Sequence, residues 1–121
     1  MSGFGGNPDG TLRFVTPTAT INVVSGQKIL VIANKAFGTS TGADDLSLWI
    51  GYIKTGDPAP TMVGQGTFGN ALGANQRATM GLSAVLSGLT PGTYRVGLLA
   101  QTTSLNWDAN DFAYVSAIVM N

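Results

Sequence analysis

DFAYVSAIVM, residues 111–120, is the stretch that decides the fold, together with GTYRVGLLAQ, residues 92–101. Both are short apolar runs rich in β-branched and aromatic residues, which is typical of strands. Neither alternates cleanly, because apolar side chains fall on both of its faces. A strand of this kind must be covered on both faces. A second sheet of the same chain can cover one face, and we expect another subunit to cover the other.

The composition also favours assembly. The chain has 121 residues and a net charge of zero, and only 10% of its residues are charged, compared with roughly 25% in an ordinary soluble domain. A monomer so poor in charge would expose much uncharged surface. The length fits one domain. The absence of a basic excess disfavours nucleic acid as a partner, and no apolar run is long enough for a membrane span.

Several classes of chemistry lack their usual residues. The chain contains no His and no Cys, and all six of its acidic residues are Asp. Most general bases, thiol nucleophiles and transition-metal ligands are therefore missing, and we expect a protein that is not an enzyme. Residues 1–6 lack the charged and apolar regions of a signal peptide. The sequence does not identify where the protein is located, and we expect an extracellular surface or a virion.

The pattern along the chain predicts an all-β, antiparallel β-sandwich or jelly roll, because alternating segments follow one another at short spacing with turn signals between them. Residues 18–24 and 28–37 are expected to form a hairpin. Residues 64–75, rich in Gly and Asn, are expected to be irregular, and residues 1–10 to be a flexible glycine-rich arm before a single domain at 11–121. The remaining expected strands are residues 12–15, 46–54, 77–86, 92–101 and 111–120.

The order of three segments resembles the C1q/TNF-like jelly roll, in its compact bacterial or phage form. These segments are the turn and strand at 24–32, the connection into a Gly-x-Tyr strand at 86–98, and the closing strand at 111–120. The resemblance implies a homotrimer packed around a threefold axis of apolar side chains. It also implies a binding or structural head, and some bacterial members are lectins with sugar sites between subunits. The residues expected at the trimer interface are Tyr94, Leu98, Phe112, Tyr114 and Ile118.

The polar loop at residues 106–111 is the candidate ligand site. Trp107 offers a flat ring for stacking on a sugar, and Asp108, Asn110 and Asp111 offer planar hydrogen-bonding groups beside it. The same oxygens form a weak calcium candidate through Asp108 and Asp111. The third interpretation is a plain loop, in which Asn and Asp cap turns and Trp107 packs on the rim of the sandwich.

Other polar residues are interpreted structurally. Asp44 and Asp45 are expected to form a solvated turn, since no insertion builds a cleft around them. Arg77 and Arg95 are expected to form ion pairs, with Asp108 and Asp111 as the candidate partners. Two functions follow from these observations: a trimeric binding head that recognises a carbohydrate or surface ligand at subunit boundaries, or a structural decoration protein of a virion or cell surface that acts by self-association.

Overall fold

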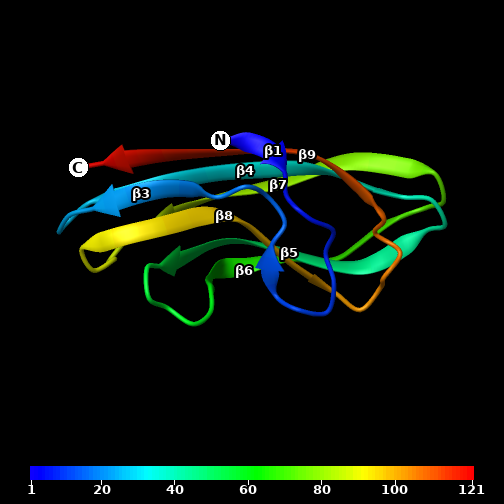
Figure 1. Ribbon diagram of the computed structural model, residues 1–121, viewed down its shortest axis with the longest axis horizontal. Helices are drawn as coiled ribbons and strands as arrows, with labels where there is room; N and C mark the ends of the chain where they lie inside the picture. Colours follow the sequence, from blue (N-terminus) through cyan, green and yellow to red (C-terminus); the bar gives the residue numbers. More distant parts are fainter.

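The computed structural model describes residues 1–121 and consists of strands, turns and loops, with no helix (Figure 1). All strand pairs are antiparallel, so the prediction of an all-β antiparallel fold is confirmed. The strands are β1 (Ser2–Phe4), β2 (Arg13–Phe14), β3 (Ala19–Val23), β4 (Lys28–Thr39), β5 (Ala43–Lys54), β6 (Thr61–Leu72), β7 (Gln76–Leu86), β8 (Gly92–Thr102) and β9 (Ala109–Met120).

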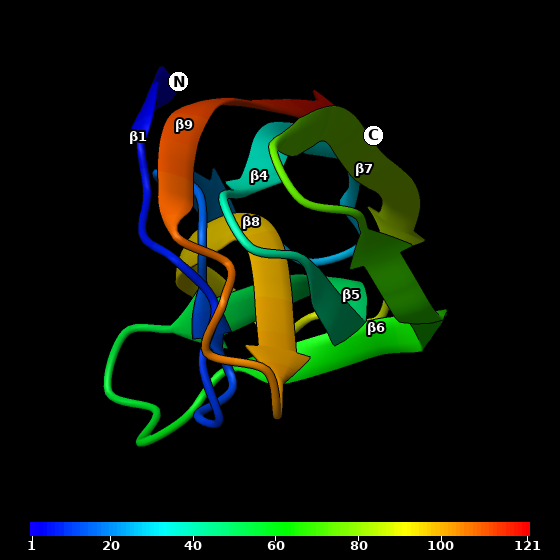
Figure 2. The ribbon, with the colours of Figure 1, turned by 90° about the vertical axis from the view of Figure 1, so that its right-hand side faces the viewer.

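The strands form two sheets that lie one over the other (Figures 1 and 2). Sheet A has the order β1-β9-β4-β7, and sheet B has the order β2-β8-β5-β6. Strand β3 also belongs to sheet B, since it pairs with the first half of β8 while β2 pairs with the second half. The two sheets together form a sandwich-like architecture.

The core lies between the sheets and contains 17 buried apolar residues. Val31 and Val115 of sheet A face Leu48 and Leu98 of sheet B in this core, and each is 0–1% exposed. Alternation along the strands places every second side chain here. Burial of one such side chain stabilises the fold by about 1.5–3 kcal/mol, so these positions specify which face of each strand points inward.

The outer face of β8 is covered by side chains of its own sheet. Leu99 of β8 points away from the core and is fully buried, because it lies between Phe14 and Trp49 on the two neighbouring strands. Gly51 makes room for it, since a Cβ atom at Gly51 would come within 2.0 Å of Leu99 Cδ1. The expectation that β8 needs another subunit to cover its second face is therefore wrong. The outer face of β9 stays exposed.

Two expected elements differ in the structure. Residues 1–10 are not wholly a flexible arm, since Ser2–Phe4 pair with β9 and the amino group of Met1 donates a hydrogen bond of 2.9 Å to Val115 O. Residues 18–24 and 28–37 do not form a hairpin, because β3 lies in sheet B and β4 in sheet A. Turn residues alone do not reveal that a chain changes sheets.

The glycine-rich segment expected to be irregular is mostly strand β6. Gly64, Gly66 and Gly69 all have positive φ values, and the pairing of β6 with β5 shifts register between Leu46 and Ile50. These features are typical of β-bulges, which glycine permits because it has no Cβ atom. The glycines therefore mark bulges in a strand.

Candidate functional site

The outer face of sheet A is the main apolar surface of the protein. Its centre combines aromatic and aliphatic side chains from all four strands, each between 38% and 63% exposed. They are Phe4, Ile32, Val85, Phe112, Tyr114 and Ile118. Scattered exposed apolar residues are ordinary, but a contiguous apolar face on one sheet marks an interaction surface. We call this set the sheet A face.

An aromatic ridge crosses one side of the sheet A face. Phe4 of β1 is paired with Phe112 of β9, and their ring centroids lie 5.2 Å apart in an edge-to-face arrangement. The ring centroids of Phe112 and Tyr114 lie 5.5 Å apart. Aromatic contacts of this kind are favourable beyond the area they bury. The ridge therefore presents an ordered apolar edge to a partner.

A hollow lies on the other side of the same face. It has a volume of about 470 Å³ and is lined by Ile32, Asn34, Gly81 and Ser83, with Ala33 and Leu82 completing it. A Cβ atom at Gly81 would come within 2.7 Å of Asn34 Cβ, so the close approach of β4 and β7 requires glycine. Tyr114, Asn34 and Gly81 occupy one row across the three strands. Ridge and hollow are thus neighbours on one surface.

The five expected interface residues separate into two groups. Phe112, Tyr114 and Ile118 lie on the sheet A face. Tyr94 and Leu98 are 2% and 0% exposed and belong to the core between the sheets, where Tyr94 also donates a hydrogen bond of 2.6 Å to Thr90 O. Their assignment to the interface is therefore corrected, because inward-facing residues of β8 are covered by sheet A.

Trp107 is a core residue and not an exposed ring. Its side chain is 2% exposed and lies edge-to-face on Phe37, with centroids 6.1 Å apart. Its indole Nε1 donates a hydrogen bond of 3.0 Å to Asp44 O. Both faces of the ring are enclosed, so it cannot stack on a sugar. The assignment of Trp107 to a ligand site is corrected for that reason.

The polar neighbours of Trp107 bind other parts of the chain. The carboxylate of Asp108 accepts hydrogen bonds from the hydroxyl and the backbone N–H of Ser40, and these hydrogen bonds lower the pKa of Asp108. The carboxylate of Asp111 forms an ion pair with Arg77. Asn110 accepts a hydrogen bond of 2.7 Å from Lys35 Nζ. These three side chains therefore fasten β9 to its surroundings and do not converge on a shared ligand position.

The calcium candidate has no supporting cluster. No group of three or more acidic, His or Cys side chains gathers in the structure, and the carboxylates of Asp108 and Asp111 are directed to Ser40 and Arg77 respectively. Calcium usually takes six to eight oxygen ligands. The expected ion pair of Arg77 with Asp111 is present, whereas Arg95 is exposed and forms no ion pair.

Lys35 is a fully buried cation that the sequence did not single out. It points into the core from β4, and Nζ donates hydrogen bonds of 2.7 Å to Asn110 Oδ1 and 2.8 Å to Asp111 O. Burial lowers the pKa of Lys35, and the negative charge of Asp111 partly offsets this effect. The contacts lie where the β4–β9 register shifts between Lys35 and Phe37. Lys35 therefore binds polar groups of β9 beside this register shift.

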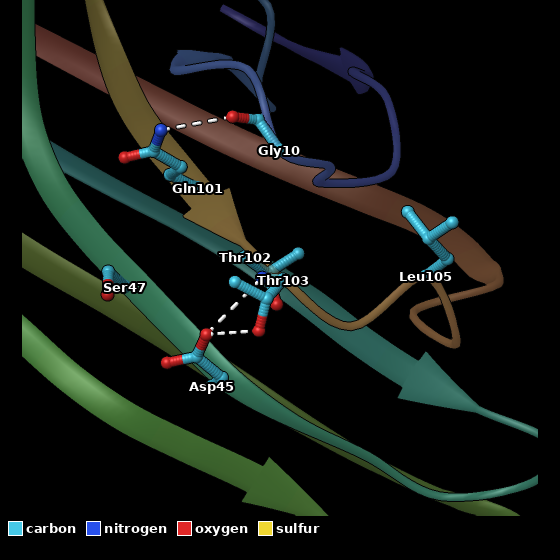
Figure 3. A pocket seen from close by; sticks show the side chains of 7 residues that line it. All are labelled: Gly10, Asp45, Ser47, Gln101, Thr102, Thr103 and Leu105. Carbon is cyan, nitrogen blue, oxygen red and sulfur yellow. Dashed lines mark hydrogen bonds between the residues drawn. The ribbon is translucent and has the colours of Figure 1, made fainter.

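A polar pocket lies on sheet B where the start of β5 pairs with the end of β8, next to the loop that follows β8 (Figure 3). Its volume is about 430 Å³, and we call it the Asp45 pocket. Thr103 donates hydrogen bonds to Asp45 Oδ2 from its backbone N–H and from its hydroxyl. The pocket is lined by Gly10, Asp45, Ser47, Gln101, Thr102, Thr103 and Leu105.

No local pattern of residues indicates this pocket. Asp44 and Asp45 are both exposed, in agreement with a solvated position. However, Asp45 adopts a left-handed conformation with φ of 52° beside a shift in the β5–β6 register, and it meets Thr103 from the other end of the chain. Neither the bulge nor the long-range contact can be deduced from the residues near Asp45.

Comparison of the chain with models of protein families, with curated proteins and with solved structures gives no match in any of the three. The structure has no helix of the length and apolarity needed to cross a membrane.

Proposed function

We propose that the protein is a non-enzymatic head that works by self-association into a homotrimer through the sheet A face. The observation that carries this proposal is the row of exposed aromatic and aliphatic side chains on β1, β9, β4 and β7. The charged residues on this side, Lys28, Arg77 and its ion-pair partner Asp111, lie near the strand ends. Interfaces between permanently associated subunits are likewise apolar in the centre and depleted in charge.

The strand order supports a jelly roll of the C1q/TNF-like kind. The first and last strands, β1 and β9, are neighbours in sheet A. From β3 onward, every connection leads from one sheet to the other, except the one between β5 and β6. These two consecutive strands lie in the same sheet and pair with each other. This arrangement differs from that of a simple meander and fits a jelly roll. The resemblance predicts that each subunit of a trimer is a jelly roll in which the outer face of one sheet is apolar and exposed. Sheet A has such a face.

The shape of the sheet A face favours a ring over a twofold dimer. The aromatic ridge lies on β1 and β9, and the hollow at Gly81 and Ser83 lies on β4 and β7. When the ridge of one copy enters the hollow of the next, two different patches meet. Contacts between different patches close into rings when the rotation permits. The proposed ring has three subunits, as the resemblance to the C1q/TNF-like jelly roll implies, and would bury the sheet A face of every copy.

Of the two functions open at the outset, the structural role has the better support. The ring assigned to sugar stacking, Trp107, lies in the core, whereas the sheet A face is fully available for self-association. We therefore infer a virion or cell-surface decoration protein whose assembly is its primary activity.

The test is the mass in solution, measured by light scattering on a size-exclusion column. We expect three times 12.4 kDa for the unmodified protein. Ile118→Lys should reduce the mass to that of one chain, because it places a charge in the apolar centre of the face. Val24→Lys is the matched control, since Val24 is 58% exposed in the turn before β4 and lies off the sheet A face. A monomeric unmodified protein would overturn the proposal.

A further inference from the structure

We propose that the Asp45 pocket binds a neutral, hydroxyl-rich ligand, namely a saccharide. This inference does not depend on self-association, because Ser47 and Gln101 of the pocket belong to sheet B and the proposed trimer contact belongs to sheet A. The volume of about 430 Å³ lies within the range of about 300–1,000 Å³ that small-molecule sites occupy. The site differs from the Trp107 loop and contains none of the side chains first considered there.

The walls of the pocket are fixed before any ligand arrives. Ser47 and Gln101 are partners across β5 and β8, so both are held by a paired sheet. The loop at Gly10 borders the pocket beside Gln101, and it is held in place by hydrogen bonds of 3.0 Å from Gln101 Nε2 to Gly10 O and 2.8 Å from Thr102 N to Asp9 O. A site with fixed walls binds more tightly, because less conformational freedom is lost on binding.

Three polar atoms of the pocket make no hydrogen bond within the protein. Thr103 holds Asp45 through Oδ2, which leaves Asp45 Oδ1 unpaired (Figure 3). The hydroxyl of Ser47 has no protein partner, and neither has Oε1 of Gln101, whose Nε2 is taken by Gly10. Carboxylate and amide oxygens accept hydrogen bonds, and a Ser hydroxyl both donates and accepts. The pocket therefore offers mainly acceptors, with one adaptable hydroxyl.

The lining residues restrict the class of ligand. No Lys or Arg lines the pocket, so the Asp45 carboxylate would repel an anion such as a phosphate. A single carboxylate is too few for a calcium site. Leu105 is the one hydrophobic lining residue, so the pocket offers a single apolar side chain beside its polar groups. Sugar hydroxyls donate to acceptors of this kind, and the C–H groups of a sugar ring can pack on a single apolar side chain such as Leu105.

The experiment has two probes. An array of immobilised glycans is incubated with the labelled 121-residue protein. Free glucose, galactose, mannose, fucose and N-acetylglucosamine are tested by saturation-transfer NMR at millimolar concentration. We expect at least one saccharide to bind the unmodified protein. The absence of binding in both assays overturns the proposal, whatever the oligomeric state.

Matched variants then locate the site. Ser47→Ala and Asp45→Asn should each weaken binding at least tenfold, whereas Asp44→Asn, a change of the neighbouring exposed carboxylate that does not line this pocket, should leave binding unchanged. Ser47→Ala removes a hydroxyl that bonds nothing in the protein, so it tests the site even if Asp45→Asn disturbs the loop at Thr103. Binding that survives Ser47→Ala and Asp45→Asn overturns the assignment. Light scattering on the same samples reports self-association separately.

Discussion

The indole of Trp107 donates a hydrogen bond of 3.0 Å to the carbonyl oxygen of Asp44, which lies 63 residues earlier in the chain. Thr102 Oγ1 donates to the same oxygen at 3.1 Å. The two donors fix the start of β5 against the end of β8 and the loop after it. The adjacent residue, Asp45, lines the polar pocket, so a core tryptophan positions the backbone from which the pocket is built.

Trp107→Ala should destabilise the fold by about 3–5 kcal/mol, the usual cost of removing a large buried aromatic side chain. Trp107→Phe keeps most of the packing on Phe37 and loses the hydrogen bond to Asp44, so it should cost less. Urea unfolding at matched protein concentration measures both. Leu105→Ala is the control in the same loop, because Leu105 is 79% exposed. A Trp107→Ala protein as stable as the control would contradict the core placement.

Gly51→Ala should destabilise the protein by about 1–3 kcal/mol, because the new Cβ atom would lie within 2.0 Å of Leu99 Cδ1 in a packed region. Gly6→Ala serves as the control, since no atom lies within 4 Å of a Cβ atom there. The double variant Gly51→Ala, Leu99→Ala should lose less stability than the sum of the losses of the two single variants. Simple additivity in a double-mutant cycle would show that the two residues do not touch.

Ser83→Trp should prevent self-association, because the new ring would fill the hollow that is proposed to receive the aromatic ridge of a neighbouring copy. Ser87→Trp places the same ring in the loop after β7, away from the hollow, and should leave the mass in solution unchanged. Light scattering distinguishes the outcomes. A Ser83→Trp protein that keeps the mass of the unmodified protein would exclude the hollow from the interface.

The stability of the protein relative to Lys35→Met should rise with pH in the window that lies between the lowered pKa of folded Lys35 and 10.5. Burial lowers the pKa of Lys35 in the folded state from its ordinary value of 10.5. Between the two pKa values the unfolded chain binds more protons than the folded chain, so stability increases with pH in this window. Below the pKa of folded Lys35, this residue is protonated in both the folded and the unfolded chain. The stability difference between the unmodified protein and Lys35→Met is then constant.

Denaturant unfolding of both proteins at several pH values measures the effect of Lys35. Subtracting the Lys35→Met curve removes every pH effect that the two proteins share. The amine of Lys35 still donates to Asn110 and Asp111 after it loses one proton, so the fold is expected to persist through the window. A difference that decreases with pH would mean that the ammonium is stabilised by its surroundings.

The sequence by itself determined the secondary structure of most of the chain. Period-two alternation at residues 77–86 and the apolar runs at 92–101 and 111–120 predicted β7, β8 and β9 closely. The absence of helical periodicity excluded helices. These features are local, since the direction of each side chain along a strand depends only on its own backbone.

Only the tertiary structure decided which strand carries that surface. Leu99 and Phe112 both lie on the outer faces of doubly apolar strands, yet Leu99 is buried by Phe14 and Trp49 while Phe112 stays exposed. The tertiary structure also places Trp107 in the core and not on the rim, and it places Asp45 beside Thr103. Each outcome depends on contacts between segments far apart in the sequence. Burial and pockets arise from such contacts, and no local pattern encodes them.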